Sequence, residues 1–202
     1  RADQAEMMFA VIAETLNLDM GSPIAVVLQH SETTAPQNSY DQMVETMEAV
    51  RDVGCQAVVV HPCSDQGYEG VIKAIDELGT TPQFRIRVNL DAPLFLGLLR
   101  VATVMIGNSS AGLIETPYFG IPAINIGRRQ EGRLHAENVI HVAHDRSAIS
   151  AALSKVIADP SLAGKMANCS RPFGDGNTGD RIVDVLRELE INDDLLIKRF
   201  ED

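Results

Sequence analysis

The feature that most constrains the fold is a set of short, continuously apolar runs separated by longer amphipathic stretches. Three of these runs are Pro23–Gln29 (PIAVVLQ), Gln56–His61 (QAVVVH) and Thr103–Gly107 (TVMIG). Unbroken apolar runs are typical of strands that helices cover on both faces, because half-exposed strands alternate apolar and polar residues. Strand and helix patterns alternate about six times along the chain. The sequence therefore predicts an α/β fold with a doubly wound parallel sheet of the Rossmann type.

The periodicity of apolar residues predicts the individual elements. We expect strands at 23–29, 56–61, 84–88, 103–107, 122–126 and 139–142. We expect helices at 2–17, 39–53, 67–78, 94–102, 113–119, 147–158, about 161–168, 177–190 and 192–200.

The composition excludes several classes of protein. The chain has 202 residues, of which 45% are apolar and 22% charged, as in ordinary globular proteins. Its 17 Lys and Arg against 28 Asp and Glu give 17 − 28 = −11, which argues against a nucleic-acid or anionic-membrane partner. No run approaches the roughly 20 apolar residues that span a bilayer. The cysteines, Cys55, Cys63 and Cys169, lack the spacing of a disulfide framework, so we expect free thiols in a cytoplasmic protein.

Polar residues follow the predicted strands where each strand ends. They are His30-Ser31-Glu32, Pro62 to Asp65, Asn89, Asn108-Ser109-Ser110 and Gly127 to Gln130. The carboxyl ends of parallel strands meet at one edge of the sheet, and ligands of such sheets bind there. We therefore expect a ligand site along this edge.

The most suggestive motif is the turn after the fourth strand, Gly107 to Pro117 (GNSSAGLIETP). Small residues such as Gly112 let a phosphate approach the backbone, and Ser109 and Ser110 add hydroxyl donors. Glu115 lies about a turn and a half into the following helix, within reach of ribose hydroxyls. The alternative is that Ser109 is only an N-cap and Glu115 a solvated helix residue.

The loop after the fifth strand, Asn125 to Arg133 (NIGRRQEGR), is the second motif. Its three arginines and one glutamate give a local charge of 3 − 1 = +2 in an acidic chain. The planar guanidinium groups of Arg129 and Arg133 suit phosphate or carboxylate. The alternative is a solvated loop with internal ion pairs.

His30 follows the first strand, where a histidine can act as acid or base, as a phosphate donor or as a polar cap. We interpret Asp65 as a helix cap, with a role at the ligand edge as the alternative. His141 and His144 have no suitably spaced third ligand, so we expect structural or surface roles and no metal site. Asn177 or Thr178 is expected to cap a later helix.

Other catalytic signatures are missing from the chain. The patterns GxxxxGK[ST], GxGxxG, GxSxG and HExxH do not occur. The sequence thus offers no support for triphosphate hydrolysis, dinucleotide redox chemistry, esterase chemistry or zinc proteolysis.

The chain resembles UDP-N-acetylglucosamine 2-epimerases, most closely the hydrolysing, sialic-acid-pathway branch, over roughly residues 23–190. The resemblance rests on residues 107–115, 119–122, 125–127, 129–130, 132–133, 138–140 and 173–177. It implies the glycosyltransferase-B architecture, with residues 1–202 as the carboxyl-terminal, nucleotide-sugar-binding half. Residues 1–20 are then a linking helix and residues 177–202 terminal helices. Arg1 in place of a starting Met fits a chain that begins inside a longer protein.

The resemblance also implies a reaction that needs no metal or other cofactor. UDP-GlcNAc loses UDP to give 2-acetamidoglucal, and water then releases N-acetylmannosamine. His30 matches the family histidine that stabilises the leaving UDP. The expected UDP-binding residues are Asn108, Ser109, Ser110, Gly112, Glu115, Arg129 and Arg133.

Two departures from the family pattern limit these expectations. The carboxylate acid and base groups of the family lie mainly in the other domain, so we expect this chain alone to bind UDP weakly and to catalyse nothing. The His30 loop reads His-Ser-Glu-Thr rather than His-Arg-Arg-Glu-Asn, which puts an allosteric UDP-GlcNAc site in doubt. The same reaction on UDP-2,4-diacetamido-bacillosamine, a glycosyltransferase and a non-catalytic UDP-sugar-binding module remain alternatives. The full-length protein is expected to be a homo-oligomer.

Overall fold

The computed structural model describes residues 2–166 and 168–197. Its centre is a six-stranded parallel sheet in the order β3-β2-β1-β4-β5-β6. The strands are β1 (Ile24–Leu28), β2 (Gln56–Val60), β3 (Phe84–Arg87), β4 (Val104–Gly107), β5 (Ala123–Ile126) and β6 (Val139–Val142). Each lies within its predicted range. The predicted doubly wound sheet is confirmed, with the strand order reversing direction between β1 and β4.

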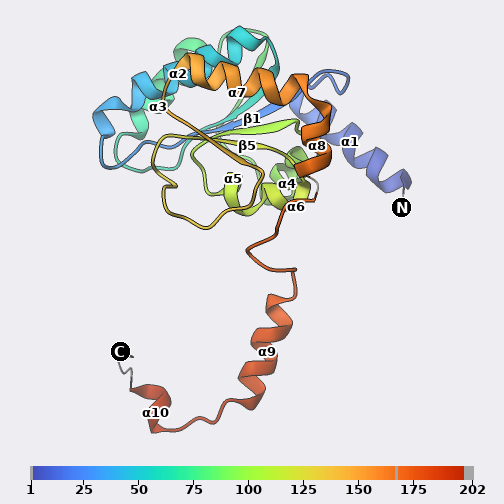
Figure 1. The fold of residues 1–202 in the computed structure, drawn as a ribbon, viewed down its shortest axis with the longest axis vertical. Helices are drawn as coiled ribbons and strands as arrows, with labels where there is room; N and C mark the ends of the chain where they lie inside the picture. The colour runs from blue at the N-terminus through green and yellow to red at the C-terminus, as the bar shows by residue number, and fades with distance from the viewer. Residues whose placement is uncertain (1, 167, 198–202) are drawn as a thin grey trace. The chain divides into compact units, whose positions relative to one another are not determined.

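Helices cover both faces of the sheet (Figure 1). One face carries α2 (Ser39–Val53), α3 (Tyr68–Leu78) and α7 (Arg146–Ala158); the other carries α1 (Ala2–Leu16), α4 (Ala92–Val101), α5 (Ala111–Ile114) and α6 (Thr116–Phe119). Alternate residues of β1 enter opposite layers: Ala25 and Val27 belong to the first core, and Ile24 and Val26 to the second. This two-sided burial explains why the strand sequences are apolar without interruption.

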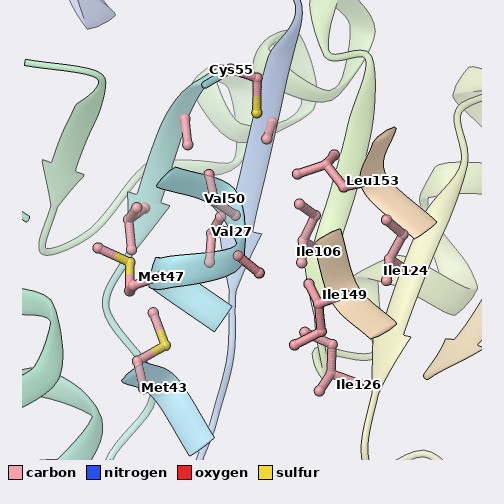
Figure 2. Packing of buried hydrophobic residues seen from close by; sticks show 14 of the residues in the cluster. Val27, Met43, Met47, Val50, Cys55, Ile106, Ile124, Ile126, Ile149 and Leu153 are labelled. Atoms are coloured by element: carbon pink, nitrogen blue, oxygen red, sulfur yellow. The ribbon is translucent and has the colours of Figure 1, made fainter. Parts of the chain in front are cut away.

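The first core is the larger of the two apolar clusters. Figure 2 shows Ile106, Ile124 and Ile126 of the sheet lying against Ile149 and Leu153 of α7. In Figure 2, Val50 of α2 lies close to Val27 of β1, and Met43 and Met47 of the same helix belong to the same cluster. This packing fixes the positions of the strand ends, and with them the loops of the ligand edge.

Two predicted helices begin two residues earlier than expected, and the last three end earlier than expected, at Met166, Glu188 and Leu196. Helix α4 begins two residues earlier than expected, because the Asp91 side chain accepts a hydrogen bond from the Leu94 amide at 2.9 Å and caps it. The predicted helix 113–119 begins earlier, at Ala111, and is interrupted at Glu115. Pro117 has no N–H to continue the helical ladder, and the Thr116 hydroxyl instead donates to the Gly112 carbonyl at 2.7 Å.

The chain divides into two compact units, residues 1–170 and 171–202. The first ends with α8 (Pro160–Met166); the second contains α9 (Thr178–Glu188) and α10 (Asp193–Leu196). Asn177 holds the N-cap position of α9, although its side chain makes no capping hydrogen bond. Residues 198–200 of the last predicted helix lie outside the described residues. In the described part of the chain, none of the helices has the length and apolar character needed to cross a bilayer.

Candidate nucleotide-sugar site at the carboxyl edge of the sheet

The candidate site lies at the switch point between β1 and β4. The two strands pair through Leu28 and Gly107, so the His30 loop and the serine turn start side by side. Gly107 has a φ of +132°, and a Cβ there would collide with the Leu28 carbonyl oxygen. Only glycine fits this close approach of two backbones.

Asn108 joins the two loops. Its Oδ1 accepts a hydrogen bond from the His30 amide at 2.7 Å, and its Nδ2 donates to the His30 carbonyl at 2.9 Å. The Asn108 residue is fully buried. Its side chain therefore holds the backbone of the catalytic candidate rather than facing a ligand.

His30 is held in its neutral form. Its Nδ1 accepts a hydrogen bond from the Cys63 amide at 3.1 Å, which leaves Nε2 as the protonated nitrogen. Burial first, and the Arg129 guanidinium second, lower the pKa of His30 to about 4. At neutral pH this side chain is a hydrogen-bond donor without a positive charge.

Arg129 lies next to His30 and is fixed from two directions. It forms an ion pair with Asp65 at 2.9 Å and donates to the Asn108 carbonyl at 3.3 Å. Gln130 donates to the same carbonyl at 2.7 Å. The prediction that Asp65 caps a helix is wrong, because Gly67 is the N-cap of α3. The hydrogen bond from Arg129 lowers the pKa of Asp65, which stays ionised.

The two serines of the turn after β4 differ in exposure and in hydrogen bonding. Ser109 is buried, and its Oγ accepts a hydrogen bond from the Ala111 amide at 3.3 Å, but it precedes the N-cap position that the alternative interpretation gave it. Ser110 is half-buried and occupies the N-cap position of α5 without a capping hydrogen bond from its side chain. Gly112 is buried and faces the interior against Met105 and Ala123.

Glu115 is not the solvated residue of the alternative interpretation. Its Oε2 is buried and has no hydrogen-bond partner among the described residues. Burial raises the pKa of this carboxyl. This oxygen has hydrogen-bonding capacity that the described residues leave unused, and a ligand hydroxyl group reaches it only when the side chains around it move.

Cavities lie on both sides of the arginine loop. One of about 580 Å³ is lined by Glu32, Thr33, Thr34, Ala35, Arg128, Arg129 and Glu131. The other, of about 420 Å³, includes Arg133, His135 and His141. Arg133 is exposed and stands apart from the network around His30. The structure thus brings His30, Asn108 and Arg129 into one network and leaves Arg133 outside it.

The ligand atoms of His30, Cys63 and Asp65 lie within 4.8 Å of one another, a donor set that suits zinc. However, the Cys63 amide occupies His30 Nδ1 and the Arg129 cation occupies Asp65. These contacts oppose a cation at this position.

Sequence reasoning missed the contact between Glu32 and His144, whose positions 112 residues apart carry no local signal.

The strand order and the polar carboxyl edge define a Rossmann-type domain of the kind that forms each half of glycosyltransferase-B proteins. The sequence model described as UDP-N-acetylglucosamine 2-epimerase matches residues 2–187. The chain belongs to this family.

Individual relatives agree with this assignment. The chain is 29% identical over 188 residues to the UDP-N,N'-diacetylbacillosamine 2-epimerase (hydrolyzing) of Legionella pneumophila, covering 93% of this chain and 48% of the relative. It is 28% identical over 179 residues to the UDP-N-acetylglucosamine 2-epimerase of Neisseria meningitidis, covering 86% and 45%. The chain spans about half the length of these curated relatives.

A solved structure shares the fold. The Neisseria meningitidis UDP-GlcNAc 2-epimerase bound to UDP-GlcNAc superimposes with a TM-score of 0.73 at 16% identity, covering 91% of this chain and 50% of that chain.

Proposed function

We propose that this chain is the UDP-binding half of a hydrolysing UDP-N-acetylglucosamine 2-epimerase. The observation that carries the proposal is the meeting of neutral His30, Arg129 and the Ser109-Ser110 turn at the switch point of a chain from this family. In the proposed reaction, UDP leaves C1 of UDP-GlcNAc as a proton leaves C2, giving 2-acetamidoglucal. Water then adds to give N-acetylmannosamine.

Stabilisation of the leaving UDP is the part of the reaction that these residues suit. Negative charge grows on the diphosphate as the bond from C1 to oxygen breaks. Arg129, the Nε2–H of His30 and the hydroxyls of Ser109 and Ser110 are donors for that charge. Because Asn108 and Cys63 already hold His30, little reorganisation is needed when the charge develops.

The uridine end is assigned to a different group. We infer that the unpartnered Oε2 of Glu115 accepts hydrogen bonds from ribose hydroxyls. The predicted contact of Gly112 with the nucleotide is not part of this proposal, because Gly112 faces Met105 and Ala123 in the interior. Arg133, on the exposed side of the arginine loop, contributes a further positive charge for the diphosphate.

We further infer that the groups that move the C2 proton lie outside this chain, which by itself is inactive. The full-length enzyme is proposed to be cytoplasmic, in keeping with its free cysteines, and homo-oligomeric. The similarity to the Legionella relative favours a second candidate, the same reaction on UDP-2,4-diacetamido-bacillosamine. The residues of this edge are assigned to the UDP group, which the two candidate substrates share, and not to the sugar.

Calorimetric titration of the chain with UDP, UDP-GlcNAc and ADP tests the assignment. We expect saturable binding that prefers uridine, weakened about tenfold by Ser109→Ala and by Glu115→Ala, as for the loss of one hydrogen bond to a charged group. The full-length protein should release UDP from one of the two UDP-sugars, and its sugar product identifies the substrate. A full-length protein that neither binds UDP nor turns over either substrate contradicts the proposal.

A further inference from the structure

Glu32 is a buried carboxylate that joins three loops of the candidate site. Its Oε1 accepts hydrogen bonds from the Arg128 amide at 2.8 Å and from Nε2 of His144 at 3.1 Å. Glu32 belongs to the loop after β1, Arg128 to the loop after β5, and His144 to the loop after β6. Burial alone raises the pKa of Glu32, but these hydrogen bonds outweigh it and keep the pKa below the usual value.

The local backbone is shaped around this contact. Gly127 has a φ of +71°, and a Cβ there would collide with Oε1 of Glu32 and Nε2 of His144. The amide of Arg128 reaches the carboxylate because Gly127 turns tightly at this point. A salt bridge on the protein surface does not require such a fit.

The contact lies next to the two groups that face the proposed diphosphate. Glu32 is two residues after His30, and Arg128 immediately precedes Arg129. Asn108 already anchors the His30 backbone to β4. The hydrogen bond from the Arg128 amide to Glu32 connects the His30 loop directly to the Arg129 loop.

We propose that Glu32 is a positioning residue that fixes Arg129 opposite His30 by holding the Arg128 amide. The proposal rests on the proposed function of this edge as a UDP site. It assigns Glu32 no contact with the reacting atoms. Without the Glu32 carboxylate, Arg129 keeps its contacts with Asp65 and the Asn108 carbonyl, but its loop loses the side-chain contacts to the His30 loop and to His144. The guanidinium is then held less firmly opposite His30.

Two readouts test this role. The first is the NMR titration of the His30 ring, whose charged neighbours are Arg129 and Asp65, beside the Cys63 thiol. Burial is the larger cause of the low pKa of His30 and remains in the variant, so we expect Glu32→Ala to raise this pKa only by the part that the Arg129 charge contributes. Glu32→Gln should leave it unchanged, because the amide oxygen can still accept both hydrogen bonds.

The second readout is UDP affinity. Glu32→Ala should weaken UDP binding about tenfold, and Glu32→Gln by less than about twofold. When Arg129→Ala is already present, Glu32→Ala should add no further loss, because its effect passes through Arg129. The matched control is Glu137→Ala, which removes a carboxylate that accepts the Ser170 amide at 2.7 Å before β6 begins, away from this edge.

The outcomes separate the two proposals. A Glu32→Ala variant with an unchanged His30 titration refutes the positioning role. So does an equal loss of UDP affinity with and without Arg129, which would mean that Glu32 only stabilises the fold. If the wild-type chain and the full-length protein do not bind UDP, the proposed function fails, while the His30 titration still decides the role of Glu32.

Discussion

Replacement of Asn108 by alanine should lower stability and UDP affinity together. The change removes hydrogen bonds of 2.7 and 2.9 Å and leaves the amide and carbonyl of His30 without partners. Each unsatisfied buried group costs about 1–3 kcal/mol, and the half-buried position of His30 favours the lower part of that range. The total is about 3 kcal/mol. At about 2–4 °C per kcal/mol for a protein of this size, the melting temperature should fall by about 6–12 °C.

Asn138→Ala provides the matched control for this prediction. Asn138 is also fully buried, and its Nδ2 donates two hydrogen bonds, to Thr116 and Ile121, both at 2.8 Å. It lies before β6, at the opposite edge of the sheet. Thermal melts should show a similar loss of stability in both variants, and calorimetry at a temperature where both are folded should show weaker UDP binding in Asn108→Ala alone. Equal UDP affinities in the two variants would refute the anchoring role of Asn108.

Three further predictions follow from single groups. Because the pKa of Glu115 is raised, the fold loses stability as the pH rises through that pKa. The melting temperature of Glu115→Gln should therefore exceed that of wild type at pH 7 and equal it below about pH 4. The variant should also bind UDP less tightly. The lowered pKa of His30 costs stability as the pH falls from 6.5 towards about 4, so the melting temperature of His30→Gln should depend less on pH in that window. Gly107→Ala meets both a positive φ and the Leu28 carbonyl, and should lower the melting temperature far more than Gly54→Ala, where φ is +76° but the space is open and the cost is about 1–2 kcal/mol.

The strands were predictable because their signal is local. A run such as Ala25–Val27 is apolar at every position, since successive residues enter different cores. Helix ends were harder to predict, because they depend on single hydrogen bonds. The Asp91 cap moves one boundary by two residues, and Pro117 interrupts a helix whose apolar pattern continues across it.

The candidate site was predictable as a location but not as a network. The rule for parallel sheets places His30, Asp65 and Arg129 at one edge, and the structure brings them together. The sequence does not indicate which of these side chains pair with one another. Asp65 fits a helix cap in its local sequence and pairs with an arginine 64 residues away. Such pairs depend on strand order and loop path, which local patterns do not encode.

The two ends of the proposed UDP site differ in how far they are prepared for a ligand. At the diphosphate end, His30 and Arg129 have all of the contacts that hold them in place. At the ribose end, Glu115 keeps a buried oxygen without a partner, at a cost to stability that leucine would avoid. In the proposed complex a ribose hydroxyl group would supply the missing hydrogen bond, so the cost would fall on the empty protein and be recovered on binding. Of the buried side-chain atoms that lack a partner among the described residues, Oε2 of Glu115 is the one that belongs to a carboxylate. A costly group of this kind is expected where a residue is retained for binding rather than for stability.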